Sequence, residues 1–143
     1  MKKVILMVIG VFAFSIITSA RELPVKFEQL PAPAQTFITA NFSGDPMLLA
    51  VREDDLVRPD YEVRLTSGTQ LEFDHAGALK KIASRDGVPS ELIPDSIRNY
   101  VSSLYPNVKY VEYEIGRYTY EVSLSNGWEL KFNSRFDVIE IDD

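Results

Sequence analysis

Two stretches of thirteen residues, 59 positions apart, have nearly the same sequence. The first is YEVRLTSGTQLEF at 61–73 and the second is YEVSLSNGWELKF at 120–132, with seven of the thirteen positions identical. Self-similarity at so long a period is typical of duplicated supersecondary units. The sequence therefore predicts a tandem repeat, with repeat 1 at about 28–84 and repeat 2 at about 90–143.

Each repeated stretch has the pattern of a β-hairpin. In the second copy, residues 120–124 alternate apolar and polar side chains, as in a strand with one buried face, and the return strand continues the alternation. Asn126-Gly127 is expected to supply the two positive-φ residues of a type I′ turn, and Ser67-Gly68 has the same place in the first copy. The repeat therefore indicates shape rather than reactivity.

A helix and two further strands complete each unit. Apolar residues at helical spacing predict the helices. They are Ala34, Phe37, Ile38 and Phe42 in the first copy and Ile97, Tyr100, Val101, Leu104 and Tyr105 in the second. Extended stretches at 46–54 and 108–115 precede the hairpins, and short strands at 79–84 and 138–142 follow them. Each unit is thus a helix followed by four antiparallel strands.

The two units are expected to form a single domain. One helix cannot cover four strands alone, so we expect an α+β fold in which both units share one curved sheet, with both helices on its apolar face. Residues 84–89 then connect the halves within that domain, because each half is too small to be stable alone.

Residues 1–20 have the pattern of a secretory signal peptide. Two lysines give a positive start, residues 4–17 are apolar, and small residues close the segment. The apolar run is shorter than the ~18–20 residues of a membrane-spanning helix. We therefore expect cleavage before Arg21, which leaves a mature domain at 21–143 that is not attached to a membrane and, without cysteine, has no disulfide.

The mature domain is acidic. The chain has 15 Lys and Arg against 21 Asp and Glu, and two of the lysines lie in the expected leader, so the mature net charge is −8. This charge argues against binding to nucleic acid, whose phosphates would be repelled, and against an anionic membrane surface. It is compatible with a protein partner.

No set of residues predicts catalysis. His75 is the only histidine, no cysteine is present to complete a zinc site, and the segment from Asp74 to Gly77 has the composition of a tight turn. No serine lies in a nucleophile elbow such as G-x-S-x-G. Carboxylate pairs that could serve a glycosidase are equally expected as outward strand residues; they are Glu62, Glu72, Glu112 and Glu114. We predict that the protein is not an enzyme, with an exported hydrolase of unrecognised type as the second alternative.

One acidic cluster is a candidate for calcium. Glu53, Asp54 and Asp55, with Asp60 nearby, supply several oxygens from one loop, as hard cations require. The spacing does not match an EF-hand, and a solvated acidic loop is the simpler interpretation. A calcium-responsive sensor is therefore kept as the first alternative function.

The aromatic residues are interpreted first as core packing, and those that do not fit the core register suggest a protein-binding surface. The chain has seven Tyr, eight Phe and one Trp, and tyrosine with arginine on an open sheet face is typical of protein recognition. Six residues, chosen because their parity is opposite to that of the core set, are predicted to form this face. They are Arg64, Glu72, Tyr110, Arg117, Glu129 and Lys131.

With these landmarks the chain resembles the PepSY-like periplasmic proteins of Bacteroidetes, which are similar in architecture to the β-lactamase inhibitor protein. The likeness rests on the leader, on LPAPAQTFITANF at 30–42, on YEVRLTSGTQLEFD and GALKKI at 61–74 and 77–82, and on their second copies. It implies a periplasmic location and a tandem-repeat α+β fold with helices on a bent sheet. It also implies inhibition or regulation of a secreted enzyme and, for some members, a response to calcium, but it supplies no catalytic residue.

The expected function follows from these observations together. We expect a non-enzymatic periplasmic module that binds another exported protein, as an inhibitor or regulator of a secreted enzyme. No cofactor is expected, and calcium enters only with the sensor alternative. The oligomeric state is left open.

Overall fold

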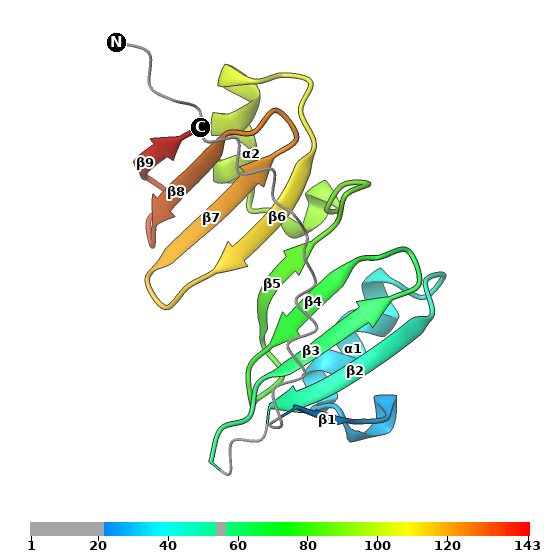
Figure 1. The fold of residues 1–143 in the computed structure, drawn as a ribbon. Helices are drawn as coiled ribbons and strands as arrows, with labels where there is room; N and C mark the ends of the chain where they lie inside the picture. The colour runs from blue at the N-terminus through cyan, green and yellow to red at the C-terminus, as the bar shows by residue number, and fades with distance from the viewer. Residues whose placement is uncertain (1–21, 54–56) are drawn as a thin grey trace.

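The structure, a computed structural model, describes residues 22–53 and 57–143. The expected leader at 1–20, and with it the cleavage site, lies outside the described residues. In chain order (Figure 1) the elements are β1 (Glu22–Pro24), a 3-10 turn η1 (Phe27–Gln29), α1 (Ala32–Asn41), β2 (Met47–Glu53), β3 (Tyr61–Leu65), β4 (Gln70–Phe73), β5 (Leu79–Ala83), a 3-10 turn η2 (Ser90–Leu92), α2 (Asp95–Leu104), β6 (Tyr110–Ile115), β7 (Thr119–Leu124), β8 (Glu129–Asn133) and β9 (Val138–Asp142).

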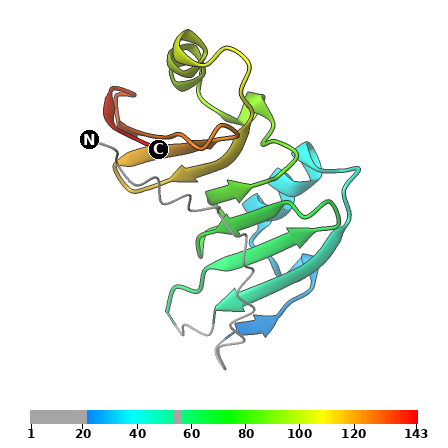
Figure 2. The ribbon, with the colours of Figure 1, turned by 45° about the horizontal axis from the view of Figure 1, so that its top comes forward.

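Nine antiparallel strands form one sheet, and their order across the sheet is their order along the chain. Figures 1 and 2 show this succession running from β1 at one edge to β9 at the other. The predicted α+β class and the predicted single sheet are confirmed. Because α1 precedes β2–β5 and α2 precedes β6–β9, a helix followed by four strands occurs twice along the chain. The duplication inferred from the sequence stays a prediction.

β1 is a strand that the sequence pattern does not predict. It spans only three residues and ends at a proline, so no alternation of apolar and polar residues marks it. It pairs with the end of β2, where Glu22 lies opposite Glu53 and Pro24 lies opposite Val51. The sheet therefore has one more strand than the two predicted units supply.

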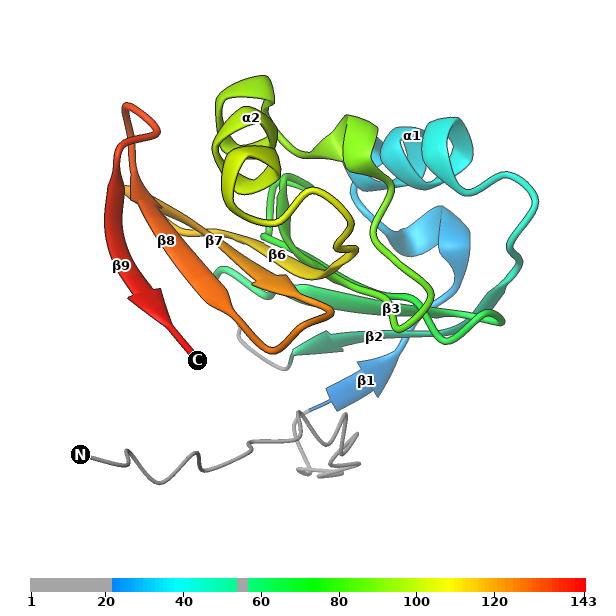
Figure 3. The ribbon, with the colours of Figure 1, turned by 90° about the horizontal axis from the view of Figure 1, so that it is seen from above.

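The core lies between the sheet and the two helices, which cover the same side of it (Figure 3). Phe37 of α1 meets Phe73 of β4 edge-on, with ring centroids 5.7 Å apart, and Tyr100 of α2 meets Phe132 of β8 in the same way at 5.9 Å. Phe73 and Phe132 are fully buried, as the alternation predicts. Among the described residues, neither helix has the length and hydrophobicity needed to span a membrane.

The turn between β7 and β8 differs from the predicted type I′ turn. The N–H of Gly127 donates to the carbonyl of Leu124 over 3.0 Å, and the N–H of Leu124 donates to the carbonyl of Trp128 over 2.8 Å. Gly127 has φ +94°, but the only described non-glycine residue with positive φ is Phe136, so Asn126 is not left-handed. The connection is a three-residue loop with glycine in its left-handed position, an arrangement that needs one positive φ rather than two.

Candidate functional site

The side of the sheet that faces away from the helices carries the candidate site, and we call it the open face. In β3, Val63 and Leu65 are buried under the helices, so the alternate residues Glu62 and Arg64 point to the open face. Residues directly opposite each other on paired strands share a face. The strand register therefore identifies the other members.

Two rows of register partners cross the open face. The first row is Pro24, Val51, Glu62, Glu72, Lys81, Glu114, Glu121, Lys131 and Glu140. The second row is Arg64, Gln70, Ala83, Glu112, Ser123, Glu129 and Asp142. With the pair Glu22 and Glu53 beside them, ten carboxylates and three cations of the described chain lie on this face. The open face is thus strongly acidic.

Several carboxylates face one another directly across neighbouring strands. The pairs are Glu22 and Glu53, Glu62 and Glu72, Glu114 and Glu121, and Glu129 and Asp142. Like charges in directly opposite positions destabilise a sheet. The cations of the face relieve this repulsion only in part. Nζ of Lys81 lies 3.0 Å from Oε1 of Glu112, and Nζ of Lys131 lies 3.6 Å from Oε2 of Glu121.

Burial and mutual repulsion raise the pKa of three of these carboxyl groups. Burial raises the pKa of Glu62, and the charge of Glu72 raises it further. Burial raises the pKa of Glu72 as well, against the opposing effect of Lys81. The pKa of Glu129 is raised by burial first and then by Glu121. A positive group brought to the open face would favour the ionised forms and reduce the repulsion.

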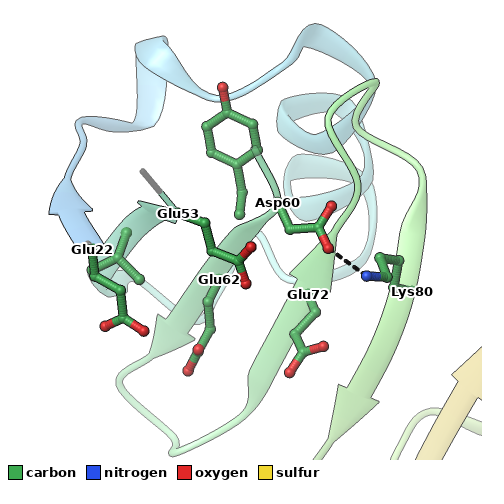
Figure 4. Close-up of a pocket in the computed structure, with 8 residues that line it drawn as sticks. Glu22, Glu53, Asp60, Glu62, Glu72 and Lys80 are labelled. Carbon is green, nitrogen blue, oxygen red and sulfur yellow. Dashed lines mark hydrogen bonds and ion pairs between the residues drawn. The ribbon is translucent and has the colours of Figure 1, made fainter. Parts of the chain in front are cut away.

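A first hollow of about 100 Å³ lies at the β1 end of the open face. It is lined by Glu22, Val51, Glu53, Asp60, Tyr61, Glu62, Glu72 and Lys80. Figure 4 shows the carboxylates of Glu22, Glu62 and Glu72 pointing the same way, whereas Lys80 points to Asp60, with which it forms an ion pair. The charge of this lysine is therefore directed at Asp60 rather than into the row of glutamates.

A second hollow of about 150 Å³ lies at the β9 end of the open face. It is lined by Glu121, Glu129, Leu130, Lys131, Glu140 and Asp142. Nζ of Lys131 lies 3.7 Å from Oε2 of Glu140, and this lysine is the single cation among the residues that line the hollow. Both ends of the open face therefore concentrate negative charge.

Four of the six residues predicted for a partner-binding face lie on the open face. They are Arg64, Glu72, Glu129 and Lys131. Arg117 lies instead in the turn between β6 and β7, where its guanidinium carbon is 5.3 Å from the ring centroid of Tyr118. Their role in binding a partner stays a prediction.

The placement of Tyr110 on that face is wrong. Tyr110 is only 8% exposed and belongs to the hydrophobic core. A register shift between Tyr110 and Glu112 interrupts the alternation in β6, so Tyr110 and Tyr113 are both buried despite their odd spacing. A parity argument fails wherever one strand carries an extra residue.

Of the calcium candidate, the structure describes Asp60, which forms an ion pair with Lys80, and Glu53. Glu53 ends β2, is exposed and borders the first hollow. Asp54 and Asp55 lie outside the described residues. Within residues 22–53 and 57–143, no three or more His, Asp or Glu side chains are placed to hold a metal ion.

The sequence identifies single carboxylates and pairs on this face, Glu114 among them, but not the two continuous acidic rows. Glu114, Glu121 and Glu140 were each ordinary outward-facing strand residues, and only the register aligns them in one row. The signal that could have found them is the recurrence of glutamate at the outward positions of successive predicted strands.

Comparison with known proteins gives consistent relatives. Residues 59–140 match the family model described as "Putative beta-lactamase-inhibitor-like, PepSY-like". A "putative periplasmic protein" of the DUF2874 family from Bacteroides vulgatus is 40% identical, with a TM-score of 0.80 over 85% of this chain and 97% of its own. A "putative calcium-regulated periplasmic protein" from Bacteroides thetaiotaomicron is 38% identical, with a TM-score of 0.82 over the same shares. A second Bacteroides vulgatus protein, a "putative periplasmic protein of unknown function", is 30% identical, with a TM-score of 0.80 over 85% and 99%. No curated protein matches the chain significantly.

Proposed function

The chain belongs to the beta-lactamase-inhibitor-like, PepSY-like family and is periplasmic, and we propose that it is a non-enzymatic binding module whose open face receives another exported protein. The contact surface of that partner is basic. The complex regulates the partner, which we take to be a secreted enzyme, by covering part of its surface.

The observation that carries this proposal is the acidity of a sheet face that no described element covers. Carboxylates such as Glu62 and Glu72 lie opposite each other, and this arrangement weakens the isolated domain. A field of one sign attracts partners of the opposite sign, speeds their association and rejects partners of like charge. A face that is unfavourable for folding is therefore well suited to recognition.

The arrangement of the two halves also supports the proposal. We infer that α1 with β2–β5 and α2 with β6–β9 are duplicated units, as the repeated sequence indicates. Each unit contributes one hollow to the same side of the sheet. A single partner can then contact both ends of one continuous sheet face.

The non-enzymatic part of the proposal is supported by the surroundings of the one histidine. His75 is exposed in the turn after β4, where Oδ1 of Asp74 accepts the N–H groups of Ala76 and Ala78, both at 2.9 Å. Asp74 is therefore engaged in the turn rather than in orienting the imidazole. An acid–base catalyst needs a partner that fixes its geometry.

The regulatory part is supported by the description of the family as inhibitor-like. An inhibitor needs a stable surface complementary to its target rather than reactive groups. The domain offers such a surface on a sheet whose other side is fixed by the core.

The proposal is tested by identifying a periplasmic partner and measuring its affinity as a purified protein. The variant Glu62→Lys/Glu121→Lys reverses two charges in the first row. Its control, Glu28→Lys/Glu91→Lys, makes the same charge change at exposed residues of η1 and η2, which lead into the helices. We expect at least a tenfold loss of affinity for the open-face variant and less than a twofold change for the control. Equal affinities for the two variants would overturn the proposal.

A calcium-responsive sensor is the second candidate function. Glu53 borders the first hollow together with Glu22 and Glu62, and one similar protein is described as calcium-regulated. Carboxylate oxygens are the ligands that Ca²⁺ prefers, and the described carboxylates would have to move closer together to share one ion. Thermal melting with and without calcium separates this candidate from the main proposal.

A further inference from the structure

β9 (Val138–Asp142) is an edge strand, and no described strand pairs with its outer side. All of its residues after Val138 are exposed. In an edge strand, alternate backbone N–H and C=O groups point away from the sheet and lack a strand partner. Such a strand accepts an added strand unless a local feature prevents the pairing.

The two edges of the sheet are protected in different ways. β1, the other edge strand of the described chain, has three residues and includes Pro24, which has no N–H to donate. β9 has five residues and no proline. A register shift leaves Ile139 as an extra residue, but Glu140, Ile141 and Asp142 continue the strand. The main feature that protects β9 against unwanted strand pairing is therefore its negative charge.

The side chains of β9 differ on its two sides. Glu140 and Asp142 point to the open face, where they are the register partners of Lys131 and Glu129. Ile141 pairs with the buried Leu130 on the helix side and is 39% exposed. An incoming strand beside β9 would therefore meet carboxylates on one side and an exposed isoleucine on the other.

The negative charge around β9 favours a binding partner of positive charge. The second hollow has four carboxylates and one lysine among its lining residues. A second copy of the chain paired through β9 would place Glu140 and Asp142 next to the same carboxylates, which is unfavourable for like charges in adjacent strands. A segment with lysine or arginine at alternate positions would instead match the carboxylates.

We propose that β9 binds an extended, basic segment of another exported protein, which adds to the sheet as a further strand. Backbone hydrogen bonds to β9 hold the segment, its Lys or Arg side chains lie over Glu140 and Asp142, and its alternate apolar side chains pack beside Ile141. This is strand addition to an exposed sheet edge, in which the main chain supplies affinity and the alternate side chains supply specificity. The inference rests on the proposed function and specifies how the partner of the open face enters.

The probe for this proposal is a synthetic peptide of alternating lysine and valine with blocked ends. Backbone amide hydrogen exchange of the protein is measured by NMR with and without the peptide. We expect the outward amides of β9 to exchange at least tenfold more slowly in the complex. A peptide of alternating glutamate and valine should not bind. A lysine peptide in which the valines are replaced by proline should bind at least tenfold more weakly, because it keeps the charge but cannot donate those hydrogen bonds.

Variants locate the binding site. Glu140→Gln/Asp142→Asn should weaken binding of the lysine–valine peptide about tenfold. Glu28→Gln/Glu91→Gln removes two exposed carboxylates near the helices and should change it less than twofold. Unchanged exchange in β9, equal binding of the proline peptide, or self-association of the free protein through β9 would each overturn the inference.

The two proposals fail in different ways. One outcome is that the peptide binds, that Glu62→Lys/Glu121→Lys weakens this binding, and that the β9 amides stay unprotected. In that case the open face binds partners but the edge-strand inference is wrong. If a purified periplasmic partner is also insensitive to the open-face charges, the proposed function itself is wrong.

Discussion

Glu62 and Glu72 lie directly opposite each other on β3 and β4. At the corresponding place in the second half, Glu121 lies opposite Lys131, with 3.6 Å between Oε2 and Nζ. The same position in the sheet thus carries a repulsive pair in one half and an attractive pair in the other. This contrast allows the energetic effect of the acidic rows to be measured.

Glu62→Gln should stabilise the isolated domain. The substitution removes one charge of the repulsive pair and keeps the size of the side chain, so we expect the free energy of unfolding at pH 7 to rise by about 0.2–1 kcal/mol. Urea unfolding gives this value. The matched change Glu121→Gln removes both the attraction to Lys131 and the repulsion from Glu114, so its gain in stability should be smaller. A gain of equal size in both variants would show that repulsion between opposite residues is not the cause.

The raised pKa of Glu62, Glu72 and Glu129 predicts a loss of stability as pH rises. A carboxyl group whose pKa is higher in the folded state than the ordinary 4.5 keeps its proton in the folded chain after the unfolded chain has lost it. The free energy of unfolding should therefore fall as pH rises from 4.5 through the folded-state pKa of each group. In the variant Glu62→Gln/Glu72→Gln/Glu129→Gln, the free energy of unfolding should change less with pH in this window. Urea unfolding at a series of pH values measures this.

Asp45 should have the opposite effect on the pH dependence of stability. Burial raises its pKa, but hydrogen bonds donated by Ser67 and Thr66 outweigh burial and lower the pKa below 3.8. Its stabilisation is present above the unfolded value and is lost as pH falls through the folded pKa. Asp45→Asn should remove that acid-side loss and leave the higher window unchanged.

Gly77→Ala and Gly127→Ala should differ in their effect on stability. Both glycines have φ near +90°, a conformation that costs an L-residue about 1–2 kcal/mol. A Cβ at Gly127 meets nothing within 4 Å, whereas a Cβ at Gly77 would lie 2.8 Å from Cβ of Pro31 and 3.0 Å from the backbone N of Ala34. We expect Gly127→Ala to lose only the conformational term and Gly77→Ala to lose more, because the start of α1 must move. Equal losses in urea unfolding would contradict this.

Tyr110→Ala should destabilise the protein far more than Tyr118→Ala. Tyr110 is buried in the core, so its truncation should cost about 3–5 kcal/mol, as for other large aromatic residues. Tyr118 is 68% exposed, and its truncation should change the free energy of unfolding by less than about 0.5 kcal/mol. A small change in the free energy of unfolding for Tyr110→Ala would contradict its burial and support the open-face position that its parity predicted.

The sensor alternative predicts a rise in melting temperature with calcium. A site on the folded protein stabilises it by about 1.4 kcal/mol when free calcium is about tenfold above the dissociation constant. Glu53→Gln should reduce this shift, and magnesium should produce less of it because it prefers a stricter geometry. No shift at millimolar calcium, or one that Glu53→Gln leaves intact, would remove the alternative.

The parts of the fold that follow from regular alternation could be predicted from the sequence. The burial of Phe73 and Phe132 followed from their place in the repeated hairpin. Irregular features could not be predicted in this way. β1 is too short to show a period, the extra residue beside Tyr110 breaks the parity of β6, and Asn126 was assigned a conformation that only Gly127 adopts.

The candidate site was less predictable than the fold because it depends on strand register. Glu62 and Glu72 were recognisable as outward-facing residues of one hairpin. Their continuation through Glu114 to Glu140 depends on which residues face each other in successive strand pairs, including pairs with register shifts. The sequence shows the charge of each residue, but the acidity of the open face arises only when the strands assemble into the sheet.

The succession of strands in chain order has a consequence for how the domain reaches its native state. In the described part of the chain, each strand from β2 to β9 pairs with the strand that precedes it, and the connections that contain a helix, β1 to β2 and β5 to β6, are the longest. Each pairing of strands that no helix separates therefore closes a small loop, which loses less chain entropy than joining distant segments. Proteins whose contacts join residues close in sequence fold faster than proteins whose contacts join distant residues. We therefore expect this domain to fold rapidly compared with other antiparallel sheets. Rapid folding would shorten the time during which the apolar strands of a periplasmic chain are exposed to aggregation and proteolysis.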